Sequence, residues 1–529
     1  MVICTHAPSK EHQLTVGQDG VYHPILCNDN TLGPTLTKLT STLCDEAFHF
    51  EQWLTSPYMP TPTIIEAAQA LYRGHDVKEI SRSDAGAYNL SLTTKALNRI
   101  IEQSKQHHEK SICFVTGVPG AGKTLVGLNI ANERHQYDEQ EHAVFLSGNG
   151  PLVAVLREAL ARDEIKRFKG KITKTASKRK VAAFIQNIHH FRDAYLPPSE
   201  QVPAEKVAIF DEAQRAWTKE QTAKFMLKRH VPGWNMSEPE FLISVMDRHQ
   251  DWTVIICLIG GGQEIHTGEA GLLAWFDALR DHFPDWNVYV SPQISDVEYT
   301  HGKPLEHLFT GLRLYREPNL HLSVSLRSFR NERVSAFVKS LLDENLPVAQ
   351  QLYSELSPNY PITITRSLEK AQEWIRAQAR GTERYGLIAS SGAKRLRQFG
   401  IWVQSNIQAE NWFLNDKEDI RSSYFLEDTA TEFDIQGLEI DWAIVAWDAD
   451  YRIEKGHFKA YNFTGSSWKT VCKKDAQLYL KNTYRVLLTR ARQGFVIFIP
   501  EGCDADLTRQ SSFYDGIYYY LKKIGMKEL

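Results

Sequence analysis

The sequence predicts an α/β protein with two lobes in tandem, each a parallel sheet covered by helices. The first observation is a series of short apolar runs at residues 111–115, 143–146, 207–210 and 254–259, each separated from the next by helical patterns. These runs lack the alternation of half-exposed strands, as expected when helices cover both faces of a sheet. Their spacing leaves room for crossover helices, which favours a doubly wound parallel sheet.

A second set of apolar runs predicts the second lobe. It comprises residues 362–365, 386–389, 443–446 and 495–499, with a helical pattern at 368–380. We place the first lobe at residues 85–320 and the second at 321–529, and we treat residues 1–84 as a small N-terminal extension. Turn signals and an amphipathic helical pattern at 63–73 mark this extension.

Composition limits the possible functions. The chain has 529 residues, of which 42% are hydrophobic and 24% charged, as in folded globular proteins. No apolar run approaches the roughly 20 residues of a membrane helix, and no secretory leader pattern is present. We therefore expect a cytoplasmic protein without a membrane partner. The net charge of −3 means that the basic residues of any nucleic-acid-binding surface must be concentrated in one region of the chain.

The seven cysteines occur singly, and Cys113 and Cys257 are predicted to be buried hydrophobic residues.

A phosphate-binding loop follows the first predicted strand. Residues 117–124 (GVPGAGKT) match G-x-x-x-x-G-K-[ST] between a strand and a helix, the context that this motif requires. Its glycines, Gly117, Gly120 and Gly122, let backbone amides surround a phosphate at the helix N-terminus. The motif predicts that Lys123 reaches the β- and γ-phosphates of ATP and that Thr124 binds Mg²⁺.

Two adjacent carboxylates follow a later strand. Residues 207–214 (VAIFDEAQ) end an apolar run in Asp211 and Glu212, about ninety residues after the phosphate loop. Such a pair alone is usually a solvated strand end, but after a phosphate loop it predicts a Walker B site. Asp211 is then a Mg²⁺ ligand, and Glu212 is the base for the attacking water.

Five further segments follow a recognisable order and resemble motifs of superfamily 1 helicases: 145–151 (FLSGNGP), 260–264 (GGGQE), 322–329 (LSVSLRSF), 431–439 (TEFDIQGLE) and 484–492 (YRVLLTRAR). The resemblance implies two tandem RecA-like lobes of the P-loop NTPase class, with ATP bound between them. It also implies that the cleft closes on ATP and relaxes after hydrolysis, which drives movement along a strand.

The same resemblance assigns roles to individual residues. Gln263 would sense the γ-phosphate, while Arg327 and Arg490 would reach the triphosphate from the second lobe. The backbone of Gly437 would approach the γ-phosphate, and Glu439 would contact the ribose.

The resemblance also concerns the nucleic-acid strand and the base of the nucleotide. The segment 145–151 would contact the backbone of the nucleic-acid strand, through Ser147 and Asn149. Superfamily 1 enzymes often carry a glutamine upstream of the phosphate loop that reads adenine. Residues 92–101 contain none, which leaves adenine specificity open.

The amino-acid sequence around these motifs is similar to that of one bacterial family, the Schlafen-group-3-like DNA/RNA helicase domain proteins. The matching segments include TPTIIEAAQALYRGHDVKEISRSDAGA, FVTGVPGAGKT, IQNIHHFRD, FDEAQRAW, GGGQEIHTGEAG and NTYRVLLTRARQG, across about residues 55–500. Family members often carry a nuclease-like domain before the motor. Residues 1–84 hold no Glu-x-Lys, so we read them as the remnant of such a domain plus a linker and predict no nuclease activity. A nuclease is then either a separate partner chain or absent.

Local basic segments indicate where a strand would bind. Residues 166–180 (KRFKGKITKTASKRK) hold eight basic and no acidic residues, among them Lys166, Arg167, Lys169 and Lys171. This density suits phosphate contacts, although a merely solvated insertion has the same composition. The following segment, 187–191 (NIHHF), would place His189, His190 and Phe191 near a base, although histidines beside a strand are more often structural.

A third segment, 451–474, interleaves basic and aromatic residues. It fits a single-strand surface and, equally, a β-hairpin that packs its aromatic side chains inward. Only about 100 residues separate the motifs that contain Arg327 and Gly437. With helices and strands of the usual lengths, about 100 residues are just enough to complete one α/β lobe. We therefore expect no large inserted subdomain there.

Together these features predict an ATP-dependent translocase or helicase that acts on single-stranded DNA or RNA, with phage defence or DNA repair as plausible settings. The alternative is a nucleotide-dependent ATPase switch that gates a partner nuclease, or another subunit of a defence system, without processive unwinding. A nucleic-acid-binding module with a degenerate motor is disfavoured, because every nucleotide-site residue is intact.

Overall fold

The computed structural model describes residues 2–3, 25–41, 62–75, 80, 84–118, 120–137, 142–260, 271–295, 309–324 and 329–529. The chain divides into two compact units, Met1–Pro60 and Thr61–Leu529. In the first unit, β1 (Val2–Ile3) pairs in parallel with β2 (Leu26–Cys27), and α1 (Asp29–Ser41) follows. All residues predicted to bind nucleotide or nucleic acid belong to the second unit.

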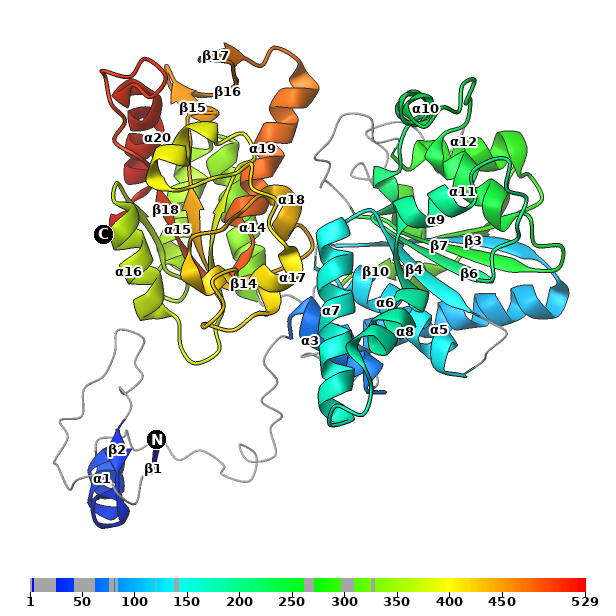
Figure 1. The fold of residues 1–529 in the computed structure, drawn as a ribbon, viewed down its shortest axis with the longest axis horizontal. Coiled ribbons are helices and arrows are strands. Elements are labelled where there is room, and N and C mark those ends of the chain that lie inside the picture. Colours follow the sequence, from blue (N-terminus) through cyan, green and yellow to red (C-terminus); the bar gives the residue numbers. More distant parts are fainter. Residues whose placement is uncertain are drawn as a thin grey trace. The chain divides into compact units, whose positions relative to one another are not determined.

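The second unit contains two parallel sheets, which confirms the predicted α/β fold of two RecA-like lobes. The strands of the first sheet lie in the order β5-β4-β6-β7-β3-β8-β9, with β10 pairing with the end of β3 (Figure 1). Their bounds are β3 Lys110–Gly117, β4 Ala143–Ser147, β5 Ile185–Asn187, β6 Val207–Asp211, β7 Thr253–Leu258, β8 Asn287–Val290, β9 Arg313–Arg316 and β10 His321–Leu322.

Both faces of this sheet are buried, which explains the unbroken apolar runs. Along β3, Cys113 and Val115 contribute to one hydrophobic cluster, while Ile112 and Phe114 contribute to the cluster on the other side. Cys113 and Cys257 are fully buried, as predicted, and burial raises the pKa of both thiols. The covering helices are α3 Ile64–Tyr72, α5 Asp84–His107, α6 Lys123–Tyr137, α7 Gly150–Arg167, α8 Lys174–Phe184, α9 Ile188–Ala194, α10 Lys219–Lys228, α11 Glu238–Met246 and α12 Leu273–His282.

The second sheet is built in the same way. Its strand order is β13-β12-β14-β18-β11-β19, with every pair parallel. The strands are β11 Ile362–Thr365, β12 Tyr385–Ala389, β13 Thr429–Ala430, β14 Ile440–Ala446, β18 Ala491–Phe498 and β19 Lys527–Glu528. The accompanying helices are α14 Phe329–Leu342, α15 Leu346–Leu356, α16 Leu368–Gln378, α17 Ala409–Leu414, α18 Glu432–Ile435, α19 Lys474–Leu488 and α20 Ser511–Ile524.

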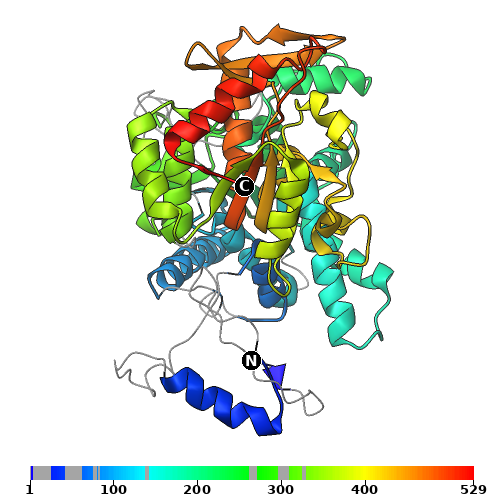
Figure 2. The ribbon, with the colours of Figure 1, turned by 90° about the vertical axis from the view of Figure 1, so that its left-hand side faces the viewer.

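A small antiparallel sheet follows β14. It consists of β15 (Tyr451–Glu454), β16 (His457–Thr464) and β17 (Ser467–Thr470), and it lies beside α20 (Figure 2). Between α14 and β13 the chain forms only elements of the second lobe, with no additional sheet among the described residues. None of the helices in the described part of the chain is long and apolar enough to cross a bilayer.

Candidate nucleotide and nucleic-acid sites

The phosphate loop lies between β3 and α6, as the motif predicts. Gly120 and Gly122 have φ angles of +76° and +88°, a region that side-chain-bearing residues rarely adopt. The Lys123 ammonium donates to the carbonyl oxygens of Gly117 and Val118 at 2.8 and 3.3 Å, and so lies across the loop. A Cβ atom added to Gly117 would approach Leu322 to 2.7 Å. β10 therefore packs directly against the loop, which only glycine allows.

The predicted metal-side residues meet at the end of β6. The Thr124 hydroxyl donates to Asp211 Oδ1 at 3.1 Å, and the Ser147 hydroxyl donates to Asp211 Oδ2 at 3.4 Å. Asp211 is buried. Desolvation, with the neighbouring Glu212 carboxylate, raises the pKa of Asp211 to about 7. An oxygen set of this kind, a hydroxyl beside a carboxylate, suits a hard divalent cation.

Glu212 occupies a left-handed backbone conformation, with φ of +52°, directly after the strand. Its carboxylate accepts a hydrogen bond from the side-chain amide of Gln214, and Gln214 Oε1 accepts one from the Gly260 backbone at 3.0 Å. Gly260 lies so close that an added Cβ would be 2.7 Å from Glu212 Oε2. Sequence reasoning missed Gln214, although its position within the predicted Walker B segment is a usable signal.

Two predicted residues, Gln263 and Arg327, lie outside the described residues, but the structure shows what flanks them. The backbone amides of Gly260 and Gly271, on either side of 261–270, both bond to Gln214, the second to its carbonyl oxygen at 3.0 Å. Upstream of Arg327, the Val118 amide donates to the Leu322 carbonyl at 3.0 Å. The described residues that flank both positions thus bond to the predicted Walker B segment and to the phosphate loop.

The two lobes touch through α7. The Asn149 side chain caps this helix by accepting from the Leu152 amide at 3.2 Å, and it also donates to the carbonyl of Gln436. The next residue, Gly437, has a φ of +75°, and a Cβ there would lie 3.3 Å from both Asn149 and Leu152. Further along α7, Arg162 bonds to the Leu414 carbonyl and to Asn415, just beyond α17.

Ser147 is buried and bonds to Asp211, while Asn149 is half-buried and bonds to the second lobe, so both side chains are engaged within the protein. In the second lobe, the Ile440 amide donates to the Arg490 carbonyl at 3.2 Å, so Glu439 and Arg490 are close in space. Arg490 is buried just beyond α19, and its Nε donates to the Val486 carbonyl in the last turn of that helix at 3.2 Å.

Buried carboxylates join these second-lobe elements. Glu432, in α18, accepts hydrogen bonds from the backbone and hydroxyl of Ser391 and from Thr483 in α19. Asp450 accepts from Tyr484 and from Ser390, both at 2.6 Å. The segment that precedes Gly437 and the helix that precedes Arg490 are thus tied to the same loop after β12.

Asp450 gives a pH prediction. Burial, together with the nearby Asp448, raises the pKa of Asp450 to about 7. Between about pH 4 and 7 the folded protein then holds more protons than the unfolded chain, so stability falls as pH rises through this window. We expect Asp450→Asn to flatten the profile of melting temperature between pH 5 and 8. Asp419→Asn is the control, because hydrogen bonds from Arg421 lower the pKa of Asp419 and any effect lies below this window. An unchanged slope in Asp450→Asn would contradict the assignment.

The basic segment 166–180 is only partly available to a ligand. Four of its eight cations form ion pairs with acidic residues of α7, at 2.6–3.1 Å: Arg167 with Asp163, Lys174 and Lys178 with Glu158, and Lys180 with Glu164. Burial acts to raise the pKa of Glu158, but hydrogen bonds from Lys174 and other cations outweigh it and lower the pKa to about 2. The predicted contacts Lys166, Lys169 and Lys171 are exposed and form no ion pair within the described residues.

The segment 187–191 differs from expectation at its aromatic residue. Phe191 is 2% exposed and packs in the core beside Tyr195, so its ring is not available for stacking on a base. His189 lies against Trp217, with ring centroids 5.1 Å apart. Burial and the nearby Arg192 lower the pKa of His189 to about 4, so the ring is neutral at physiological pH.

The alternative left open for 451–474 is resolved in favour of the inward-packed hairpin. Phe458 stacks on Tyr451, with ring centroids 4.6 Å apart. Trp468 packs against Phe463, and its indole nitrogen donates to the Thr508 carbonyl at 2.8 Å. The aromatic rings thus stabilise the small sheet, whereas Lys459 and Lys469 remain exposed.

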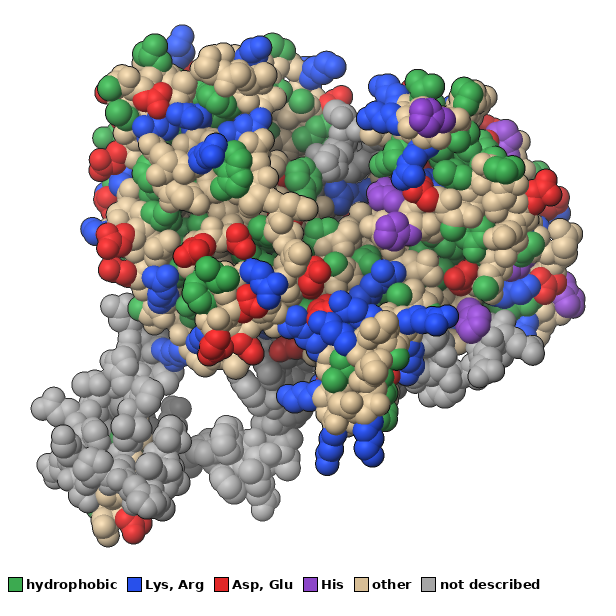
Figure 3. Space-filling model, in the orientation of Figure 1, with side chains coloured by type: hydrophobic (Ala, Val, Ile, Leu, Met, Phe, Trp, Pro, Cys, Tyr) green, Lys and Arg blue, Asp and Glu red, His purple; other side chains and the backbone are tan. Residues whose placement is uncertain are grey.

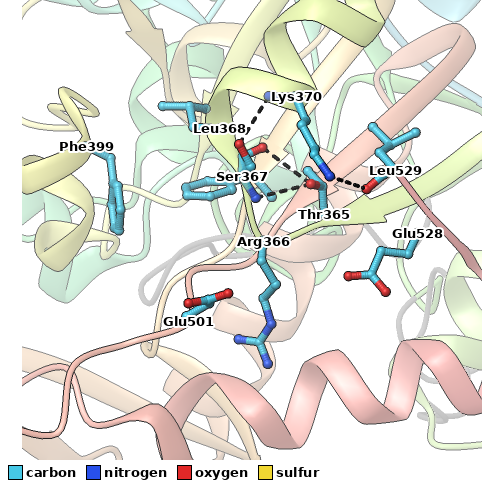
Figure 4. A pocket seen from close by; sticks show the side chains of 10 residues that line it. Thr365, Arg366, Ser367, Leu368, Lys370, Phe399, Glu501, Glu528 and Leu529 are labelled. Atoms are coloured by element: carbon cyan, nitrogen blue, oxygen red, sulfur yellow. Dashed lines mark hydrogen bonds between the residues drawn. The ribbon is translucent and has the colours of Figure 1, made fainter.

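A cavity of about 490 Å³ lies elsewhere in the second lobe, at the carboxyl ends of β11 and β18 (Figure 4). Its lining mixes charges of both signs, including Arg366, Lys370, Glu501 and Glu528. Arg366 is paired with Asp515 at 2.5 Å. None of the predicted site residues lines this cavity, so it is separate from the nucleotide site.

Comparison with known proteins identifies a matching family. The profile of the family described as "Schlafen group 3, DNA/RNA helicase domain" matches residues 110–501. No curated protein is detectably similar in sequence. Among solved structures, the Hef helicase domain of Pyrococcus furiosus is 11% identical with a TM-score of 0.26, over 81% of this chain and 99% of that one. The DUF1998 helicase MrfA bound to DNA is 10% identical with a TM-score of 0.30, over 84% and 54%. At these TM-scores the overlap carries no argument about this chain.

Proposed function

Because the chain belongs to the Schlafen group 3 DNA/RNA helicase domain family, we propose that it is an ATP-dependent translocase or helicase acting on single-stranded DNA or RNA. The observation that carries the proposal is the cluster at the ends of β3 and β6. There Lys123 lies across the phosphate loop, Thr124 bonds to Asp211, and Gln214 holds Glu212. A nucleoside triphosphatase needs a loop that binds the phosphates and a carboxylate that can accept a proton from the attacking water, and this cluster contains both.

In this proposal each residue acts on ATP in a defined way. The amides of the phosphate loop and Lys123 hold the β- and γ-phosphates, and Glu212 accepts a proton from the attacking water. Thr124 and Asp211 would hold Mg²⁺, which neutralises phosphate charge when bound. Gln263 senses the γ-phosphate, Arg327 and Arg490 approach the triphosphate, Gly437 lies near the γ-phosphate, and Glu439 binds the ribose.

Movement would follow from changes in the contact between the lobes. Asn149 follows β4, whose last residue bonds to Asp211, and it also donates to the Gln436 carbonyl beside Gly437. A change at the nucleotide therefore has a short covalent and hydrogen-bonded route to the second lobe. For the strand, we propose contacts by Lys166, Lys169, Lys171 and His189, with Arg167, Ser147 and Asn149 in supporting positions. A cytoplasmic setting in phage defence or DNA repair, with a separate nuclease or defence-system subunit, completes the proposal.

One observation favours the alternative of an ATPase switch that gates a partner nuclease. Half of the cations in the most basic segment are bound to Glu158, Asp163 and Glu164, which reduces the charge free to follow a strand. A switch needs lobe closure but not continuous contact with nucleic acid.

ATP turnover with and without nucleic acid separates the two functions. For a translocase we expect single-stranded DNA or RNA to raise kcat at least about 10-fold, because the strand favours the closed, hydrolysing state. Stimulation should weaken between about 50 and 200 mM salt, as phosphate contacts release counterions. Turnover that ignores both DNA and RNA would refute the motor and leave the switch. Duplexes with single-stranded overhangs of either polarity would then report direction and unwinding.

A further inference from the structure

The tip of the α7–α8 hairpin, residues 166–171, displays an aromatic ring on the surface. Phe168 is the C-terminal cap of α7 and is 48% exposed, in contrast to the buried Phe191. Figure 3 shows Lys and Arg side chains gathered around this protruding end of the larger unit. Exposed apolar residues are common singly, so the surroundings of the ring decide whether it has a role.

The backbone fixes the position of Phe168. Its amide donates to the Glu164 carbonyl at 3.0 Å, and its carbonyl accepts from the Lys171 amide at 3.0 Å. Lys169 and Gly170 complete the turn with φ angles of +49° and +75°. The ring is therefore presented by a tight, hydrogen-bonded turn at the end of a helix.

Basic residues flank Phe168 in the chain, and one of them lies over its ring. The Arg167 guanidinium lies over it at 5.8 Å and is itself held by Asp163 at 3.1 Å. Lys166, Lys169 and Lys171 are exposed and have no acidic partner among the residues that the structure describes. An accessible aromatic ring flanked by unpaired ammonium groups matches the chemistry of a base with its flanking phosphates. The small β15–β17 sheet differs, since its aromatic rings pack against one another and none of them is exposed as Phe168 is.

We propose that this tip is a single-strand binding site in which Phe168 stacks on an unpaired base while Lys166, Lys169 and Lys171 contact the neighbouring phosphates. The inference rests on the proposed function and names a part of its nucleic-acid surface. It replaces Phe191 by Phe168 as the stacking residue. A duplex, whose bases are stacked internally, offers the tip only its phosphates and binds more weakly.

The position of the tip also connects the bound base to the nucleotide site. α7 has 18 residues, which corresponds to about 27 Å of helix. Its first turn is capped by Asn149, which bonds to the second lobe, and Arg162 bonds to Asn415 near its other end. A shift between the lobes therefore acts on the same helix that presents Phe168.

Equilibrium binding to fluorescent oligonucleotides of about 20 nucleotides, without ATP, tests the proposal. We expect Phe168→Leu to raise the Kd for a single strand about 10-fold, the effect of one lost stack. Phe168→Trp should retain binding, because it restores a ring. Tyr519→Leu, at another exposed aromatic residue, is the matched control and should bind as the wild type does. Circular dichroism confirms that each variant is folded.

Two further comparisons separate the ring from the charges and the site from the function. A strand carrying abasic positions should bind wild type and Phe168→Leu equally, whereas an intact strand should not. Charge reversal at Lys166, Lys169 and Lys171 should reduce the salt dependence of binding, which Phe168→Leu should leave unchanged.

If only the lysine variants weaken binding, the tip holds phosphates alone and stacking is refuted. If strands stimulate ATP turnover but no tip variant changes binding, the site is wrong and the proposed function stands. If no strand binds or stimulates, both fail.

Discussion

Replacing Lys123 with alanine is expected to reduce ATP turnover by about 10²- to 10³-fold. The Lys123 ammonium lies 2.8 Å from the Gly117 carbonyl oxygen, across the phosphate loop. It is the only cation that the loop motif itself contributes, so its loss leaves the charge developing on the phosphates without its nearest partner. The substitution also weakens nucleotide binding, because ground-state ATP carries the same charge.

The measurement is steady-state phosphate release at saturating single-stranded nucleic acid, with nucleotide affinity measured separately. Lys224→Ala, on the exposed side of α10, is the control and should turn over at the wild-type rate. The fold should survive Lys123→Ala, because the ammonium group bonds to the carbonyl oxygens of Gly117 and Val118 at the loop and its removal leaves the hydrophobic core unchanged. Wild-type turnover by the variant would mean that hydrolysis occurs at another site.

The sequence was a reliable guide where local pattern decides structure. The apolar runs at 111–115 and 254–259 became β3 and β7, because strands buried on both faces require unbroken apolar sequence. The motif predicted that glycines let the loop backbone turn around a phosphate, and Gly120 and Gly122 have positive φ angles that glycine adopts readily. Thr124 and Asp211, 87 residues apart, met as expected because the carboxyl ends of parallel strands share one edge.

Prediction failed where tertiary contacts decide exposure. Phe191 and Phe168 are both aromatic residues within a basic neighbourhood, and no local pattern shows that the first is buried and the second exposed. Likewise, the pairing of Lys174 and Lys180 with acids of α7 depends on the hairpin that brings the two helices together. Short strands such as β5 and β10 have too few residues to produce a pattern.

Glu212→Gln gives the second large effect, with a different signature from that of Lys123→Ala. We expect kcat to fall about 10²- to 10³-fold, because glutamine cannot accept the proton of the attacking water. Nucleotide affinity should remain close to that of the wild type, since Glu212 is a carboxylate that would gain nothing from contact with phosphate. Glutamine has nearly the same size as glutamate and therefore fits in the same place. Gly260 lies so close to this side chain that even a Cβ atom at residue 260 would be 2.7 Å from Glu212 Oε2.

Single-turnover hydrolysis and binding of a fluorescent ATP analogue, measured on the same preparation, distinguish a base from a structural residue. Glu220→Gln, on the exposed side of α10, is the matched control. In Glu212→Gln the amide oxygen of the new side chain can still accept the hydrogen bond from Gln214, so the melting temperature should change little. If affinity falls together with kcat, Glu212 supports the loop and is not the base; if turnover is unchanged, the base is another group. Loss of hydrolysis with retained ATP binding would also trap the closed state, in which affinity for a single strand is expected to be highest.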